Sequence, residues 1–234
     1  MKEAGSIPET EKQRVKKWIL LIAMLFALAV LIISVIYLAK IKGWIGRREG
    51  SSLLTIVNSE MAAPEDPNQT LTFIDDEHMV DARCADELEK LLRDCRGAGF
   101  DPVITAAFRS SSEQRELVNE LADEYMRQGH DAERAKELAL QQIAAPGHSE
   151  HQLGLSADII QADADENGQS GIREWLCAHA WEYGFILRYP EGKETVTGHG
   201  YDPRHDRYVG QNAAKQIHEL DITLEEYVSM FYAK

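Results

Sequence analysis

The longest apolar stretch of the chain runs from Trp18 to Ala39 and contains 22 residues without a charge. As a helix that rises about 1.5 Å per residue, it would span roughly 33 Å, enough to cross a hydrocarbon core about 30 Å thick. A buried core helix is usually amphipathic or shorter, and a cleaved signal peptide has a shorter apolar region followed by a small-residue cleavage site. The pattern therefore predicts an uncleaved transmembrane anchor over residues 18–39.

The segments on either side of this anchor differ in character from the rest of the chain. Residues 1–17 form a short tail, and basic residues flank the anchor on both sides, so the positive-inside rule gives no orientation. Residues 40–70 contain several Gly, Ser and Pro and are predicted to be a tether, with a short strand at Leu53–Val57. The folded domain is predicted to occupy residues 71–234.

Within the folded domain, apolar residues recur at helical spacing in some segments and form short buried runs in others. The helical spacing predicts helices over Asp75–Arg96, Ser111–Gln128, Asp131–Ala145, Ile172–Tyr183 and Thr223–Tyr232. The short apolar runs predict strands over Pro102–Ala107, Ser156–Ile160, Phe185–Tyr189 and roughly Arg207–Val209. Because helices precede and interrupt the strands, the sequence predicts an α+β fold with a small, mostly antiparallel sheet.

Charged residues are distributed unevenly along the chain, and their balance argues against one class of binding partner. Residues 1–43 carry seven Lys/Arg against three Asp/Glu, whereas residues 44–234 carry 18 against 36, a net charge of −18. Such an acidic domain repels phosphate backbones, which argues against nucleic acid as a partner. Three cysteines in 234 residues also exclude a disulfide framework.

Two short clusters carry the chemistry of a metal site. In PGHSEHQLGLSAD, His151 lies in a turn and Asp158 in the strand that follows, and in YDPRHDRYVG, Asp202 precedes His205 by three residues. Two His and one Asp can hold zinc with a fourth position open for water, which leaves Asp202 free as a general base. A histidine beside a glycine is, however, more often a hydrogen-bonded turn residue, so the spacing alone leaves both interpretations open.

Four blocks of sequence between about Asp75 and Gly210 resemble the VanY-type D-alanyl-D-alanine carboxypeptidases, in order and with plausible spacing. The first two blocks are FRSSSEQ, which contains Arg109 and Gln114, and the Ser-x-His-x-x-Gly-x-Ala-x-Asp signature, with Ser149, His151 and Asp158. The other two are YGFILRYPEGKETVTG and YDPRHDRYVG. This family belongs to a wider group of zinc peptidases that includes the zinc domain of sonic hedgehog.

The resemblance implies a role for each of these residues. The implied zinc ligands are His151, Asp158 and His205, and Arg109 is implied to stabilise the oxyanion. Ser149 and Gln114 are implied to hold the terminal residue of the substrate, and Asp202 stands where the family has its general base.

Two positions depart from the family pattern. Asp202 replaces the usual Glu, which draws the carboxylate back by about 1.5 Å, and a misplacement of about 1 Å can cost about 100-fold in rate. Arg204 replaces a Trp and places a cation beside the site. These departures leave three alternatives open: an active enzyme, a slow enzyme, or a binding module of the same fold.

A second metal pattern lies outside this resemblance. DADENGQSGIRE fits the calcium-loop formula, in which Gly stands at position six and Glu at position twelve. Its candidate ligands are Asp163, Asp165, Asn167 and Glu174. The alternative is an acidic surface turn with Glu174 in the first turn of the next helix.

Together, the sequence predicts a single-pass membrane protein with an extracellular zinc carboxypeptidase domain. By resemblance, its substrate is the peptidoglycan stem peptide, from which it removes the terminal D-Ala. The same resemblance orients the anchor, with residues 1–17 in the cytoplasm. An L,D-carboxypeptidase acting on tetrapeptide stems is an alternative of the same class, and a wall-binding module with impaired catalysis is an alternative of a different class.

Overall fold

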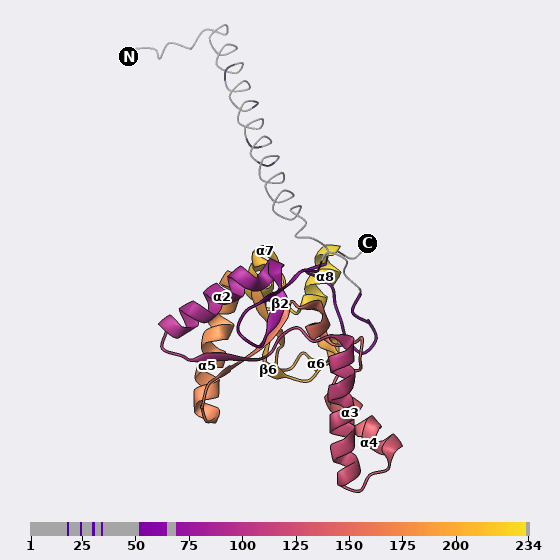
Figure 1. The fold of residues 1–234 in the computed structure, drawn as a ribbon. Coiled ribbons are helices and arrows are strands. Elements are labelled where there is room, and N and C mark those ends of the chain that lie inside the picture. Colours follow the sequence, from indigo (N-terminus) through magenta and orange to yellow (C-terminus); the bar gives the residue numbers. More distant parts are fainter. Residues whose placement is uncertain are drawn as a thin grey trace, which may run out of the picture. The chain divides into compact units, whose positions relative to one another are not determined.

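A computed structural model describes residues 52–64 and 69–232, together with the single positions 18, 24, 30 and 34 (Figure 1). The predicted tail at 1–17 and the predicted anchor at 18–39 therefore lie outside the described residues, apart from those four positions. The chain divides into two compact units, Met1–Glu49 and Gly50–Lys234. Among the described residues, no helix is both long enough and apolar enough to span a bilayer.

The second unit is built around a four-stranded sheet in which every pair of neighbouring strands is antiparallel, as the sequence predicted. The strands lie in the order β3, β4, β6, β5. Their bounds are Pro102–Ala106 for β3, Ser156–Gln161 for β4, Asp202–Tyr208 for β6 and Phe185–Tyr189 for β5. A separate two-stranded sheet pairs β1 (Leu71–Phe73) with β2 (Met79–Asp81).

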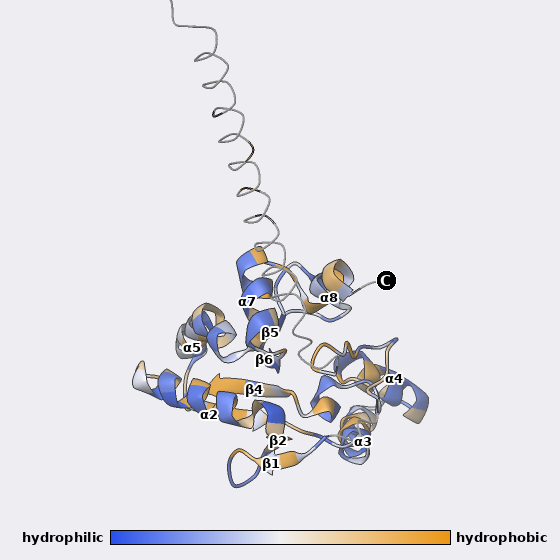
Figure 2. Cartoon of the chain, turned by 90° about the horizontal axis from the view of Figure 1, so that it is seen from above, coloured by the Kyte–Doolittle hydropathy of each residue, from blue (hydrophilic) through white to orange (hydrophobic). Residues whose placement is uncertain are grey.

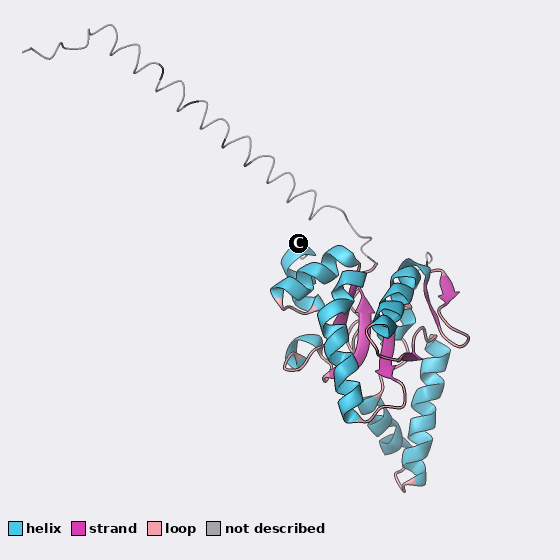
Figure 3. Cartoon of the chain, turned by 90° about the vertical axis from the view of Figure 1, so that its left-hand side faces the viewer, coloured by secondary structure: helices cyan, strands magenta, loops and turns pink. Residues whose placement is uncertain are grey.

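Helices surround the sheet, and Figure 3 shows them around the strands. The α-helices are α2 (Ala82–Gly97), α3 (Ser111–Arg127), α4 (Ala132–Gln142), α5 (Glu166–His179), α6 (Glu194–Thr197), α7 (Gln211–Leu220) and α8 (Leu224–Tyr232). The 3₁₀ turns are η1 (Glu150–Leu153) and η2 (Ala180–Tyr183). The sequence predicted most of these elements, but it missed α6, α7, η1 and the two strands β1 and β2. Its helix over 172–183 corresponds to α5, which begins earlier, at Glu166, followed by η2.

The alternation of side chains along β4 separates the two faces of the sheet. Ala157 and Ile159 belong to the main hydrophobic core, which α2 and α5 complete with residues such as Leu88 and Leu176. Asp158 lies between them in sequence and so points to the opposite face, because successive side chains of a strand alternate. Figure 2 shows the apolar β4 beside helices of mixed polarity. One face of the four-stranded sheet therefore packs against the main hydrophobic core, and the opposite face carries Asp158 and can form a binding site.

Helix α2 begins later than its hydrophobic pattern predicted. The sequence placed its start at Asp75, but Asp75 forms a turn in which its carboxylate accepts hydrogen bonds from the amides of Glu77 and His78. Asp81 is the N-cap, and its side chain accepts a hydrogen bond from the Arg83 amide. Residues 71–81 instead form the β1–β2 hairpin, with Asp75 in its turn, and the helix begins only after Asp81.

The predicted tether is wrong for residues 52–64, which belong to the folded domain. Leu53 and Val57 are buried in the main core, and Leu54 packs with residues of α7 and α8 in a second hydrophobic cluster. The predicted strand at Leu53–Val57 does not form, because residues 52–54 are a turn. The compact unit accordingly begins at Gly50 and not at residue 71.

Helices α3 and α4 form a hairpin that extends away from the sheet (Figure 1). The two helices have a small core of their own, made of Val118, Ala122, Ala135 and Ala139. A capping box at Ser110 and Glu113 fixes the start of α3. The hairpin therefore has a hydrophobic cluster separate from that of the sheet.

Candidate metal centre

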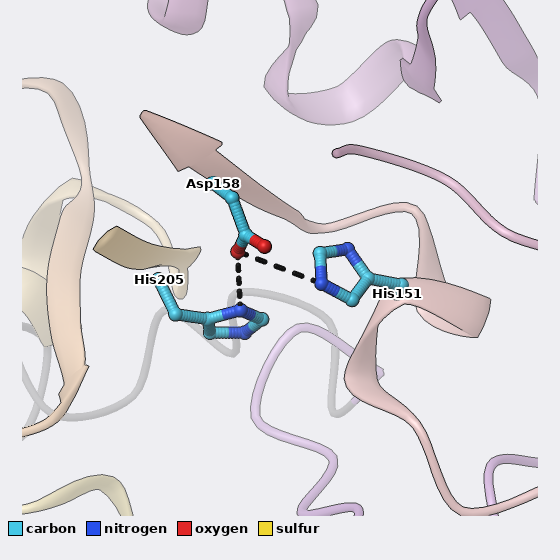
Figure 4. A group of neighbouring side chains, drawn as sticks. All are labelled: His151, Asp158 and His205. Carbon is cyan, nitrogen blue, oxygen red and sulfur yellow. Dashed lines mark hydrogen bonds and ion pairs between the residues drawn. The ribbon is translucent and has the colours of Figure 1, made fainter. Parts of the chain in front are cut away.

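Three predicted ligands meet on the open face of the sheet. Asp158 in β4 and His205 in β6 are direct cross-strand partners, and His151 lies in η1, just before β4. One donor atom from each residue lies within 4.8 Å of the others. The Asp158 carboxylate is central, 2.8 Å from His205 Nδ1 and 3.5 Å from His151 Nε2 (Figure 4). Elsewhere in 52–64 and 69–232, no other group of three such residues is gathered.

The two imidazoles are held in orientations that suit a metal. His151 Nδ1 lies 2.7 Å from the carbonyl oxygen of Ala107, so this nitrogen donates its proton and leaves Nε2 free to accept an ion. His205 presents the other nitrogen, Nδ1, toward Asp158. Such outer hydrogen bonds fix the tautomer of a ligating histidine.

Burial and mutual contact perturb the pKa values of the three groups. Burial alone would lower the pKa of His205, but the hydrogen bond to Asp158 and the negative charges of Asp158 and Glu150 outweigh it and raise this pKa to about 9. For Asp158, burial would raise the pKa, but the contacts with the imidazoles of His151 and His205 hold it well below its usual range. The pKa of His151 is lowered, mainly by burial. Without a metal, a proton is thus held between His205 and Asp158, at the position that a cation would take.

All seven residues predicted for the site line one cleft of about 460 Å³. Arg109 Nη1 donates to Gln114 Oε1 at 2.9 Å, and Gln114 Nε2 donates to the carbonyl of Ala144 at 2.7 Å, so the two side chains orient each other. Ser149 is buried and precedes η1 without capping it. Its hydroxyl is therefore not used for a local cap and is available in the cleft.

Asp202 lies at the edge of the cleft, at the start of β6. Its carboxylate accepts hydrogen bonds from Arg204, 3.2 Å from Nε and 3.3 Å from Nη2. Both departures from the family pattern are therefore in contact, and the cation at the rim is bound to the candidate base. The structure places Asp202 opposite Tyr189 on β5 and not within the three-ligand group.

Gly154 shapes the turn between His151 and Asp158. It has a φ of 66°, in the left-handed region, and a Cβ at this position would lie 3.0 Å from the backbone nitrogen of Asp81. The Asp81 amide also donates to the Gly154 carbonyl at 2.8 Å. The glycine is thus required both for the turn and for the close approach of the chain before α2.

Sequence reasoning missed a buried ionic cluster beneath the ligands. Glu150 lies between Ser149 and His151 and is only 3% exposed. The Nε atom of Arg188 donates to it at 2.7 Å, and Arg207 Nη1 lies 2.8 Å away. Burial would raise the pKa of Glu150, but the two arginines lower it below its usual range. The one signal in the sequence is an acidic residue beside a candidate ligand, which does not reveal burial.

The structure does not support the calcium site. Helix α5 begins at Glu166, so most of the proposed loop is helical, and the Asp165 side chain caps the helix by accepting from the Gly168 amide. Eight residues further along, Glu174 lies about 12 Å from the helix start, at 1.5 Å per residue. A calcium loop needs its first and last ligands to converge on one ion, and this helix separates Glu174 from Asp163 and Asp165. Asn167 lies in its first turn.

The described arrangement has the donor set of a catalytic zinc site. Two imidazole nitrogens and one carboxylate oxygen converge in an open cleft, which leaves a position for water or substrate. The half-buried Arg109, bonded to the buried Gln114, and a second carboxylate lie in the same cleft. Fold and site together are thus an α+β scaffold that carries a candidate metal centre in an open cleft.

Comparison with known proteins identifies the family. Residues 77–211 match the VanY family of D-alanyl-D-alanine carboxypeptidases, and the chain belongs to this family. A D-alanyl-D-alanine carboxypeptidase of Enterococcus faecalis is 34% identical over 176 residues, which cover 75% of this chain and 65% of the relative. The chain thus matches slightly less than two thirds of the length of that protein.

Two solved structures share the fold. One is the zinc complex of a variant of the vancomycin resistance D,D-pentapeptidase VanY, with 33% identity, a TM-score of 0.67 and coverage of 76% of this chain and 99% of the other. The other is the L,D-carboxypeptidase LdcB, with 30% identity, a TM-score of 0.62 and coverage of 76% and 86%. The fold is thus shared by D,D- and L,D-carboxypeptidases.

Proposed function

We propose that this protein is a zinc-dependent D,D-carboxypeptidase that removes the C-terminal D-Ala from peptidoglycan stem peptides. The observation that carries the proposal is the convergence of His151, Asp158 and His205 in a cleft of a VanY-family chain. The zinc bound by a structural relative supports the choice of metal. Zinc held by three ligands lowers the pKa of water to about 7 and polarises a substrate carbonyl.

The side chains of the cleft have distinct roles in this proposal. Arg109 stabilises the negative charge that develops on the carbonyl oxygen, an effect worth about 2.7–4 kcal/mol for a donor in comparable sites. Gln114 orients Arg109 through their 2.9 Å hydrogen bond and, together with Ser149, holds the terminal residue of the substrate. Asp202 takes the proton of the attacking water and returns it to the leaving amine.

Asp202 is expected to limit the rate of this reaction, because its side chain is one methylene shorter than that of Glu and its carboxylate is already hydrogen-bonded to Arg204. Its two carboxylate oxygens are bound by Arg204, so a rotation that frees one oxygen must precede proton transfer. A glutamate at the same position would extend one methylene further toward the ligands. We therefore expect Asp202→Glu to raise the turnover number.

The test is release of D-Ala by the full-length protein, purified with zinc, from a pentapeptide stem that ends in D-Ala-D-Ala. His151→Ala is the control, because it removes a ligand from the cleft. Zinc-dependent release by the wild type that disappears in His151→Ala is the expected result. Stoichiometric zinc binding without release, both in the wild type and in Asp202→Glu, would refute the proposed reaction.

A second candidate, an L,D-carboxypeptidase that acts on tetrapeptide stems, is supported by the structural likeness to LdcB. The same assay distinguishes it when the tetrapeptide is added as a second substrate. If D-Ala were released from the tetrapeptide and not from the pentapeptide, the protein would be an L,D-carboxypeptidase.

A third candidate, a wall-binding module with impaired catalysis, is supported by the ion pair between Asp202 and Arg204. Binding of stem peptides with no turnover in either the wild type or Asp202→Glu would favour it.

We also propose that residues 18–39 anchor the protein in the cell membrane with the domain outside. The support is the charge-free run of 22 residues in the sequence, together with the location of a stem-peptide substrate. Membrane fractionation followed by protease treatment of intact cells tests this topology. Cleavage of the domain from the outside is expected, and full protection would contradict the orientation.

A further inference from the structure

Glu150 occupies an unusual position for a carboxylate, since it is buried directly behind a candidate metal ligand. Its Oε1 atom lies 2.7 Å from Arg188 Nε and 2.8 Å from Arg207 Nη1. Both arginines are fully buried, with no exposed surface. The two cations therefore fix one oxygen of Glu150 and set the direction of the other.

The second oxygen of Glu150 points to His205. Oε2 lies 3.5 Å from His205 Nε2, slightly beyond hydrogen-bonding distance. Among the described residues, neither of these two buried atoms has a hydrogen-bond partner. Buried polar atoms are normally paired, so two unpaired atoms that face each other need an explanation.

The other candidate ligand shows what such a contact does. His151 has its non-ligand nitrogen bonded to the Ala107 carbonyl at 2.7 Å, which leaves Nε2 free for an ion. His205 has the reverse arrangement, with Nδ1 toward Asp158 and Nε2 toward Glu150. A neutral imidazole that binds a metal through Nδ1 must carry its proton on Nε2.

We propose that Glu150 is the positioning residue for His205: it accepts the Nε2–H hydrogen bond and so fixes the tautomer in which Nδ1 binds the metal. Arg188 and Arg207 keep the carboxylate in place, Arg188 through Glu225 of α8 and Arg207 through the carbonyl of Leu53. This inference rests on the metal site of the proposed function.

Glu150→Gln provides a sharp test because its shape is nearly unchanged. The two arginines require an acceptor, so the amide oxygen remains on them and the amide NH₂ faces His205 Nε2–H. Two donors then oppose each other and disfavour the metal-binding tautomer. Removing such an outer partner typically lowers metal affinity about 10- to 100-fold.

Asp206→Asn is the matched control. Asp206 is also fully buried and also paired with an arginine, Arg173, at 3.2 Å, but it is paired on the opposite side of β6. Zinc dissociation constants are measured for the full-length chain in mild detergent by competition with a chromophoric chelator. We expect a 10- to 100-fold loss for Glu150→Gln and less than twofold for Asp206→Asn.

The outcomes separate this inference from the proposed function. A wild-type protein that binds no zinc overturns both. Tight wild-type binding with unchanged affinity in folded Glu150→Gln overturns the role of Glu150 alone. If Glu150→Gln does not fold, ¹⁵N NMR of histidines in the zinc-loaded wild type decides: protonation of His205 at Nε2 supports the inference, and protonation at Nδ1 refutes it.

Discussion

Replacing Leu53 by alanine tests whether the segment from 52 to 64 is part of the domain or only a linker. Leu53 is 8% exposed and lies in the main hydrophobic core. A buried Leu→Ala substitution costs about 2–5 kcal/mol, through lost burial and the cavity left behind. The same change in a free linker would alter stability by no more than about 0.5 kcal/mol. Because Leu53 retains some exposure, we expect a loss near 2 kcal/mol.

The measurement is equilibrium urea denaturation of the full-length protein with excess chelator. A loss of about 2 kcal/mol, divided by a slope of about 1–3 kcal/mol/M, lowers the midpoint by roughly 0.7–2 M. Met61→Ala is the matched control, because Met61 lies in the same segment but is 45% exposed. If Leu53→Ala and Met61→Ala had the same midpoint, the packing of this segment against the core would be refuted.

Three further predictions concern pH, the rim cation and one turn. In metal-free protein, the pKa of His205 is raised to about 9, against about 6.5 unfolded, so this group stabilises the fold fully below about pH 6.5. Its contribution, about 3 kcal/mol, is lost as the pH rises through about 9, and urea denaturation of the wild type and His205→Asn should reveal the difference. Arg204→Ala frees the Asp202 carboxylate and should raise kcat several-fold in the D-Ala release assay, whereas a fall in kcat would contradict Asp202 as the base. Gly154→Ala should lower the free energy of unfolding by about 1–3 kcal/mol, because φ is 66° there and Cβ would crowd the Asp81 amide; an unchanged melting curve would disprove this.

The residues of the site were predictable because they lie in short sequence blocks. His151 and Asp158 are seven residues apart, and the turn and strand between them bring both to one face. The contribution of His205 depends on the pairing of β4 with β6, which periodicity alone does not give. The resemblance supplied what the spacing left open for these three residues, and the geometry agrees with it.

Two features of the structure, the burial of Glu150 and the burial of the segment from 52 to 64, could not be predicted from the sequence because they depend on contacts between distant parts of the chain. The burial of Glu150 is not visible in the sequence, because Arg188 and Arg207, which surround its carboxylate, are distant in sequence. The segment that contains Leu53 and Val57 is too short and irregular to show a period, so its burial is not visible in the pattern. In both cases the environment of the residue comes from other elements of the chain and not from its neighbours in sequence.

The pairing of Asp158 with His205 also sets when the ion can enter during biosynthesis. These residues are cross-strand partners on the two central strands, and 46 residues of chain lie between them, including α5 and β5. The site therefore does not exist until the segment between them has folded back and β4 has paired with β6. In a zinc finger the ion drives folding, whereas here it would enter a scaffold that is already formed. Metal acquisition would then be a late and reversible step, so a chelator should remove the ion and leave a folded apoprotein that can be reloaded.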